Sequence, residues 1–467
     1  MKIERERIKN WKIEILTYLL ISIGIFLRLF SIDRQSLWTD ELYSVYASSI
    51  QNWSEFWVYL ADDPHPPLFQ ILLRLWIRLI PGMSEITIKL FPAIISIFNL
   101  ILIGIFTRAW DSKKRFLFLC LFSLSPGAIY YAQEVRSYSL LLCLSSLILI
   151  FFEKLISEPK KIMHLCILSV LSVTISYVHL FGFIFIGSLY FVCFVYYFYH
   201  KDPISKVIFF LGFISFCFYL PFLFQLFITS RIQTASWIDP PGIVLLLTYG
   251  SLFLYTSKKY LFLTALLPVL FFIYSLVGSI QTKRNHKQKF YLTFGELSLF
   301  VAILIVVSTT LFSYIKPIAT NRNWIVTLPL VYLFASENLR NQIQNKKILL
   351  GLILFLSLSF IDFKKNFYIQ FKEDWRGTTS YLIEHCAGPV VFSDATPEYI
   401  SLYMNWQGNQ RLTPTILGNN VDLQQKETCV VKRFMGGNGK SFENSDLWKK
   451  QKETALYGFS IEEFIKY

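Results

Sequence analysis

The sequence predicts a polytopic α-helical membrane protein that carries a small α/β domain at its C-terminal end. Hydrophobic residues make up 54% of the 467 residues, aromatic residues 18% and charged residues only 16%. This composition is too apolar for a soluble chain. Apolar runs of the length of a membrane span, roughly 20 residues, recur up to about residue 361, and predicted strands alternate with helices beyond it.

We expect eleven membrane spans. The first is longer than the apolar core of a signal peptide and lacks a small-residue cleavage site, so it is predicted to be a signal anchor. The segment 242–256 is expected to lie in the interface or to re-enter the membrane, because a span there would place the basic run 283–287 outside. The eleven segments are about 13–31, 87–107, 116–131, 138–153, 162–179, 181–199, 207–227, 260–280, 292–314, 324–336 and 347–361.

The distribution of charge predicts the orientation. The N-terminus and the loops expected inside hold 21 Lys and Arg residues, against 9 in the longer outside loops, which follows the positive-inside rule. Topology thus explains the net charge of +14 without a nucleic-acid partner. We expect a cell (inner or plasma) membrane protein with a cytoplasmic N-terminus, a transmembrane domain over 1–361 and an extracytoplasmic domain over 362–467.

The first outer loop, about 32–86, is predicted to contain helices that lie in the membrane interface. Its stretch 66–80 is apolar and begins with prolines, which suit the first turn of a helix. The segment 43–60 is rich in Trp and Tyr and is expected to lie in the same way.

The tail is predicted to be a small α/β domain. Its pattern predicts helices over 374–385 and 397–406 and strands over 389–394 and 428–431. Cys386 and Cys429 are the two cysteines beyond the last span, and whether they form a disulfide is left open.

The candidate catalytic residues are Asp40 and Glu41, adjacent acids that follow the first span. They could cap the following helix, since Thr39 or Asp40 is a favourable N-cap. The alternative is that Asp40 takes a proton from an acceptor hydroxyl as a general base. Glu41 would then orient the acceptor or hold a divalent cation.

Other polar residues gather at the same predicted level of the membrane. Arg136 and Arg322 could contact a phosphate group, because a guanidinium matches phosphate oxygens, or could serve in structural ion pairs. His65, between prolines, could bind metal or phosphate or make a structural hydrogen bond. The further candidates for substrate binding at this level are Asp63, Glu134, Tyr138 and His179.

No signature of a soluble cofactor occurs in the sequence. It has no Walker loop, no dinucleotide-binding glycine fingerprint and no Cys or His pair at zinc spacing. A donor carried by a lipid therefore suits a site at the outer membrane surface better than a nucleotide. A metal requirement is left open, with Glu41 and His65 as candidate ligands.

The motifs together resemble those of the GT-C fold membrane glycosyltransferases, in the group of protein O-mannosyltransferases and aminoarabinose transferases. Six motifs over residues 28–335 occur in the order of that group, and the start of the tail is also similar. They are Ser36-Leu37-Trp38-Thr39-Asp40-Glu41, His65-Pro66-Pro67-Leu68, Ser84-Glu85 before Leu90-Phe91-Pro92, Ala132-Gln133-Glu134-Val135-Arg136-Ser137-Tyr138, Tyr177-Val178-His179, and Arg322 before Leu328-Pro329, with Asp374-Trp375-Arg376 in the tail.

This resemblance implies a GT-C fold and transfer of a sugar, with inversion, from a polyprenyl-phosphate donor on the extracytoplasmic side. It implies that Asp40 is the catalytic acid–base residue and that Glu41, Glu134, Arg136 and Arg322 line the site. Asn323 stands where an aromatic residue is common in the group. The acceptor, a lipid, glycan or protein, is left open.

Two other functions are left open by the sequence. A flippase for lipid-linked saccharides usually has polar residues near the middle of its spans, whereas those of this chain gather at the outer ends. A polysaccharide polymerase or ligase would bind the donor phosphate in the same way, but its donor would carry an oligosaccharide.

Overall fold

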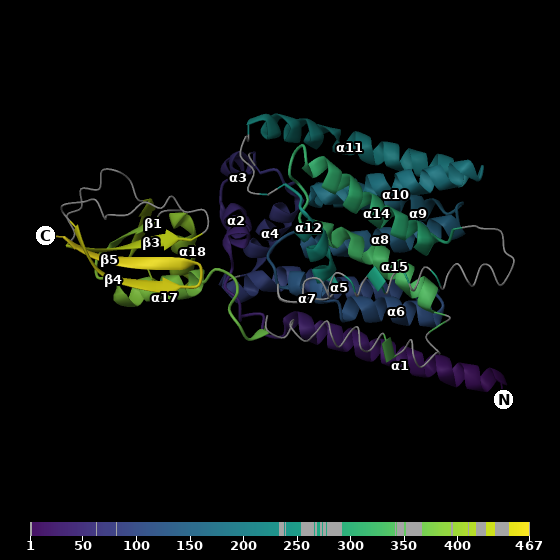
Figure 1. The fold of residues 1–467 in the computed structure, drawn as a ribbon, viewed down its shortest axis with the longest axis horizontal. Helices are drawn as coiled ribbons and strands as arrows, with labels where there is room; N and C mark the ends of the chain where they lie inside the picture. Colours follow the sequence, from purple (N-terminus) through teal and green to yellow (C-terminus); the bar gives the residue numbers. More distant parts are fainter. Residues whose placement is uncertain are drawn as a thin grey trace.

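The computed structural model shows a bundle of long helices with a small α/β domain at one end (Figure 1). The N-terminus lies at the opposite end of the bundle from this domain (Figure 1). The structure describes residues 2–61, 63–80, 82–232, 240–253, 292–340, 367–393, 396–409, 411–416, 426–434 and 448–466, together with isolated positions between these ranges.

Five helices in the described residues are long and apolar enough to cross a membrane, or six if one bent pair counts as a span. The protein is therefore a multi-pass membrane protein. The five are α5 (Glu85–Phe106), α8 (Tyr138–Ser157), α10 (Leu180–Tyr199), α11 (Ile204–Ile232) and α14 (Phe294–Ser313).

The other expected spans that fall on described residues are also helical, and the total of eleven stays a prediction. The expected spans 260–280 and 347–361 lie outside the described residues, apart from isolated positions. The other bundle helices in the described residues are α1 (Lys2–Leu29), α6 (Ser112–Ser123), α7 (Pro126–Ala132), α9 (Ile162–Val178), α12 (Ile243–Tyr249) with the 3₁₀ turn η1 (Gly250–Leu252), and α15 (Leu328–Leu339), which follows the 3₁₀ turn η3 (Asn323–Thr327).

The expected span 116–131 is broken into α6 and α7, whose axes differ by 52°. Ser125 caps α7 by accepting a hydrogen bond from Ala128 N, and Pro126 occupies the first turn, where its missing N–H costs nothing. Arg28 of α1 donates to the carbonyl oxygens of Phe122 and Ser123 at the end of α6. The guanidinium thus satisfies carbonyls that a helix end leaves without partners.

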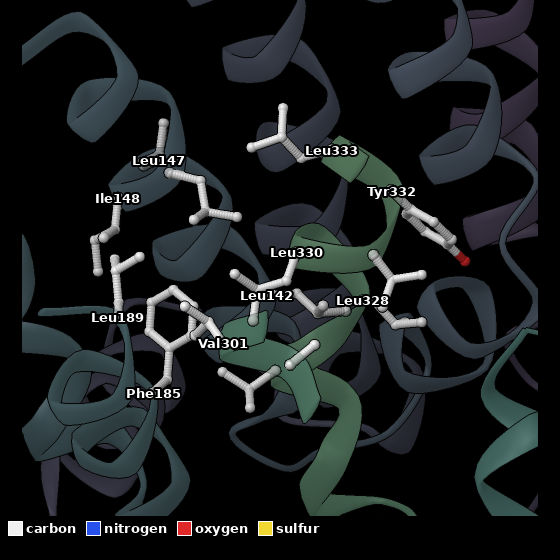
Figure 2. Packing of buried hydrophobic residues seen from close by; sticks show 14 of the residues in the cluster. Leu142, Leu147, Ile148, Phe185, Leu189, Val301, Leu328, Leu330, Tyr332 and Leu333 are labelled. Atoms are coloured by element: carbon white, nitrogen blue, oxygen red, sulfur yellow. The ribbon is translucent and has the colours of Figure 1, made fainter. Parts of the chain in front are cut away.

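The bundle core is formed where α8, α10, α14 and α15 meet (Figure 2). Leu142 and Ile148 of α8 pack with Phe185 of α10, Val301 of α14 and Leu330 of α15, and all five are buried. The 7-residue helix α12 is too short to cross a membrane. Residues 254–256 of the expected segment 242–256 lie outside the described residues, so its interfacial or re-entrant position stays a prediction.

The described residues of the segment 32–86, the predicted first outer loop, form three helices, α2 (Thr39–Ser49), α3 (Trp53–Leu60) and α4 (Leu68–Leu79). They lie between the bundle and the C-terminal domain (Figure 1). The expected helix over 66–80 is confirmed as α4, which begins after Pro67. The segment 43–60 is divided between two helices because Asn52 starts a new one, accepting a hydrogen bond from Ser54 N at 2.7 Å.

The C-terminal domain is a mixed five-stranded sheet with the order β2-β1-β3-β5-β4. Strand β1 pairs in parallel with β2 and β3, whereas β3–β5 and β5–β4 are antiparallel. The expected helices and both expected strands are confirmed, and three further strands were not expected. The elements are α17 (Trp375–His385), β1 (Val390–Ser393), α18 (Pro397–Trp406), β2 (Thr413–Ile416), β3 (Glu427–Arg433), β4 (Trp448–Leu456) and β5 (Phe459–Lys466).

Cys386 and Cys429 form a disulfide, which settles the question that the sequence left open. The bond joins the end of α17 to β3, and both cysteines are 2% exposed. It therefore fastens a helix to the centre of the sheet inside the domain core.

Candidate functional site

Asp40 and Arg322 form an ion pair where the segment 32–86 meets the bundle. Asp40 lies in the first turn of α2, and its Oδ2 is 2.9 Å from Nη1 of Arg322, which directly precedes η3. The side chains are 31% and 16% exposed, respectively. The carboxylate is therefore paired with a guanidinium and still accessible to solvent.

Arg136 brings a second guanidinium to the same helix turn. It lies in the connection between α7 and α8, and its Nη1 donates to the backbone oxygen of Asp40 at 3.1 Å and to Ser44 Oγ at 2.9 Å. One accessible acid and two arginines thus meet at one end of the bundle. This set can accept a proton and stabilise an anionic group.

The side chain of Glu41 points into the protein and is fully buried, with both oxygens engaged. Its Oε1 accepts from Val135 N at 2.8 Å, and its Oε2 accepts from Trp38 N at 3.1 Å. The same Oε2 lies 2.9 Å from Nζ of Lys372, in the segment that leads into the C-terminal domain. The helix-capping role considered for this pair of acids therefore falls to Glu41, which satisfies the backbone N–H before α2.

Glu134 is a second buried acid next to Lys372, at 4.0 Å between Oε2 and Nζ. Burial raises its pKa from 4.5 to about 6, against the opposing effect of the Lys372 charge. Its Oε1 is buried without a hydrogen-bond partner among the described residues. A carboxylate in this environment takes up a proton more readily than an exposed one.

Asp63 and His65 lie together before α4. Asp63 Oδ1 accepts from His65 N at 2.8 Å and Oδ2 from Gln70 Nε2 at 3.4 Å, and Tyr43 also hydrogen-bonds to this carboxyl group. Burial raises the pKa of Asp63. Burial, together with the charge of Arg136, lowers the pKa of His65 to about 3, so this imidazole is neutral at ordinary pH.

The ring of His179 lies beside that of His65, with the centroids 4.8 Å apart and the ring planes tilted by 33°. It occupies the sharp turn between α9 and α10, where its Nδ1 accepts from Phe181 N at 3.1 Å. The neutral ring therefore carries its proton on Nε2. Gly182 permits this turn, because a Cβ there would collide with the backbone oxygen of Ile175.

The expected site residues thus form three linked groups. Asp40, Arg136 and Arg322 make the first, and Glu41 and Glu134 the second. The third contains Asp63, His65 and His179, with the Tyr138 ring 6.1 Å from that of His179. Of the other acids in the predicted outer loops, Asp62 and Asp239 lie outside the described residues.

The two candidate metal ligands, Glu41 and His65, are not in a group of three or more ligand side chains; the described part of the chain has no such group. Sequence reasoning missed Lys372, which completes the second group. The signal for it was the charged run Lys372-Glu373-Asp374 after the last expected span.

No family model matches the chain, and no curated protein matches it. Several solved structures, in contrast, are similar to it. ArnT from Cupriavidus metallidurans in the apo state is similar with a TM-score of 0.59 at 10% identity, over 96% of this chain and 97% of that chain. ArnT bound to undecaprenyl phosphate gives 0.57 at 11% identity over 96% and 97%.

The oligosaccharyltransferase of Archaeoglobus fulgidus in the apo form is also similar, with a TM-score of 0.52 at 10% identity over 86% of this chain and 64% of that chain. The protein is therefore a polytopic membrane protein of the GT-C fold. Within that fold its similarity to ArnT, an aminoarabinose transferase, extends over almost the full length of both chains. The fold class expected from the motifs is confirmed.

Proposed function

We propose that the protein is a glycosyltransferase that moves a sugar from a polyprenyl-phosphate donor to an acceptor hydroxyl or phosphate on the extracytoplasmic face. The observation that carries the proposal is the meeting of one accessible acid, Asp40, with Arg136 and Arg322. The similarity to ArnT, which was solved with undecaprenyl phosphate, supports a donor of this class.

Asp40 would act as the base for a hydroxyl acceptor. Its carboxylate takes the proton as the acceptor oxygen attacks the anomeric carbon, and the bond from that carbon to the donor phosphate oxygen breaks with both electrons going to the phosphate. Attack from the face opposite the leaving group inverts the configuration. A phosphate acceptor is already ionised and needs no such base.

The leaving polyprenyl phosphate gains negative charge as the bond breaks, and the two arginines would stabilise it. Arg322 is held by Asp40 at 2.9 Å, so contacts within the protein already fix its guanidinium in the site. Arrangement of a cation in advance of the reaction lowers the cost of reorganisation in the transition state.

The neutral imidazoles of His65 and His179 would orient polar groups of the donor or acceptor beside Tyr138. Burial keeps the pKa of both histidines below its usual range, so they donate or accept hydrogen bonds without contributing charge. Asp63 would hold His65 by its hydrogen bond to the backbone of that residue. Glu41 would position the start of α2, and Glu134 would belong with it to the buried group that Lys372 completes.

The arrangement of the chain in the membrane is part of the proposal. The site lies at the end of the bundle that faces the C-terminal domain, opposite the N-terminus (Figure 1). With the N-terminus in the cytoplasm, as the charge distribution predicts, the site and residues 362–467 are extracytoplasmic. The protein would lie in the inner or plasma membrane.

Transfer by purified protein in detergent tests the proposal. A panel of radiolabelled polyprenyl-phosphate sugars is offered with lipid, glycan and peptide acceptors, and wild type is compared with Asp40→Asn. Label should move with wild type and not with Asp40→Asn, while both unfold at the same temperature. Transfer at the wild-type rate by Asp40→Asn would refute its role as base, and product mass distinguishes one added sugar from a polymer.

A further inference from the structure

We infer that Lys372 is a positioning residue for the transfer reaction, through which the segment leading into the C-terminal domain sets the geometry of Asp40 and Arg136. The catalytic part of this inference rests on the proposed function. The structural part does not, because it concerns contacts between buried groups of this chain.

Lys372 places one positive charge between two buried acids. Its Nζ lies 2.9 Å from Glu41 Oε2 and 4.0 Å from Glu134 Oε2. The three side chains are 7%, 0% and 2% exposed. Two carboxylates buried together repel each other, and this ammonium attracts both and offsets one of the two negative charges.

Glu41 in turn fixes the backbone on both sides of the site. It accepts from Val135 N at 2.8 Å, and the next residue is Arg136, which donates to the backbone oxygen of Asp40. It also accepts from Trp38 N, directly before α2. Loss of the ammonium would therefore disturb the two backbone segments that carry Asp40 and Arg136.

The segment that carries Lys372 is itself fastened to the loop 33–39. Gln35 Oε1 accepts from the backbone N of Phe371 at 3.1 Å and of Lys372 at 3.4 Å. Glu373 Oε2 accepts from Thr39 N at 3.1 Å. These bonds connect residues more than 330 positions apart in the sequence; Thr39 and Glu373, for example, are 334 positions apart. Lys372 therefore lies near the site only because the chain folds in this way.

Arg376, four residues after Lys372, forms an ion pair that also connects the C-terminal domain to the bundle. Its Nε lies 2.8 Å from Glu85 Oε2 at the start of α5, and its Nη2 donates to the backbone oxygens of Asp33 and Gln35. Glu85 also accepts from Leu37 N at 3.0 Å. The segment 371–376 therefore holds the loop before Asp40 through several contacts, and among them Lys372 pairs with Glu41, the residue next to Asp40.

The test compares Lys372→Met with Lys372→Arg, with Lys432→Met as a matched control. Lys432 forms a lysine–glutamate pair of similar length, 2.9 Å from Nζ to Glu462 Oε1, within the sheet. Each variant is measured for kcat and KM in the transfer assay, for thermal unfolding, and for amide hydrogen exchange in detergent.

Lys372→Met should lower kcat by about 10- to 100-fold, because displacement of a catalytic group by about 1 Å can cost about 100-fold, and should change the KM for the donor much less. Lys372→Arg should recover most of the lost rate. Exchange at Val135 and Trp38 should become faster in Lys372→Met, with exchange in β3 and β5 unchanged. Lys432→Met should retain the wild-type kcat.

Wild-type exchange at Val135 and Trp38 in Lys372→Met would overturn the inference, whether or not transfer is observed. Normal kcat in Lys372→Met, with Asp40→Asn inactive, would overturn it while leaving the proposed function in place. Absence of transfer by wild type with every donor would instead refute the proposed function. Hydrogen exchange at Val135 and Trp38 would then still test whether Lys372 holds these two backbone segments.

Discussion

Arg322 Nη1 lies 2.9 Å from Asp40 Oδ2, although 282 residues separate them in the sequence. The pair joins α2 to the turn before η3. The acid stays accessible, which the proposed role of general base requires, and the arginine lies beside it, where the proposal places the donor phosphate.

Replacement of Arg322 tests its role toward the donor phosphate. Arg322→Met should lower kcat by about 100- to 1,000-fold, the usual effect of losing one electrostatic contact to a transition state. Arg322→Lys should retain part of the activity, because it keeps the charge but not the planar set of donors. Steady-state transfer kinetics provide the measurement.

The matched control for Arg322 is Lys161→Met. Lys161 pairs with Glu158 at 2.6 Å, and both side chains are largely exposed. This variant should transfer at the wild-type rate. Unchanged kcat in Arg322→Met would show that the phosphate is stabilised elsewhere.

The raised pKa of Glu134, about 6 compared with 4.5, predicts how stability depends on pH. The unfolded chain ionises this group first, so the free energy of unfolding should fall as pH rises from about 4.5 to 6 and then level off. Glu134→Gln removes this loss. At pH 7.5 the variant should be more stable than wild type by about 1–2 kcal/mol, since one pKa unit corresponds to about 1.4 kcal/mol.

Thermal unfolding in detergent at pH 4.5 and pH 7.5 checks this expectation. The two proteins should differ little at the lower pH. A Glu134→Gln variant less stable than wild type at pH 7.5 would mean that attraction to Lys372, at 4.0 Å, outweighs the cost of burial.

The disulfide predicts sensitivity of the C-terminal domain to reduction. Replacing both Cys386 and Cys429 with Ser should lower the free energy of unfolding by about 2–4 kcal/mol, the usual effect of losing a disulfide. A reducing agent should lower the unfolding temperature of wild type and leave that of the double variant unchanged. Equal sensitivity of both proteins would contradict a role for this bond.

Arg28 is expected to stabilise the end of α6, where the chain bends into α7. It donates to the backbone oxygens of Phe122 and Ser123, at 3.0 and 3.2 Å, and to Ser96 Oγ. Arg28→Leu would leave buried carbonyls without donors and should cost about 1–3 kcal/mol. The unfolding temperature in detergent should fall, and Arg28→Lys should fall less. An unchanged temperature in Arg28→Leu would show that other groups satisfy these carbonyls.

The sequence predicted elements well where the local signal was strong. The helix expected over 397–406 is α18 (Pro397–Trp406), because proline at its start and an apolar face specify it locally. The charged strand β4 (Trp448–Leu456) was missed, since its run Lys449-Lys450-Gln451-Lys452-Glu453 has no apolar alternation. It is an edge strand formed by pairing with β5, and charged residues are common on such edges.

The sequence by itself determined that this chain is a multi-pass membrane protein, because long apolar runs can only be buried in lipid or against one another. Its motifs also indicated the residues of the candidate site, including Asp40 and Arg322. Tertiary structure decided how they are used. Folding turned Glu41 inward to Lys372 and left Asp40 beside Arg322, because the direction of a charged side chain depends on partners that only the folded chain brings within reach.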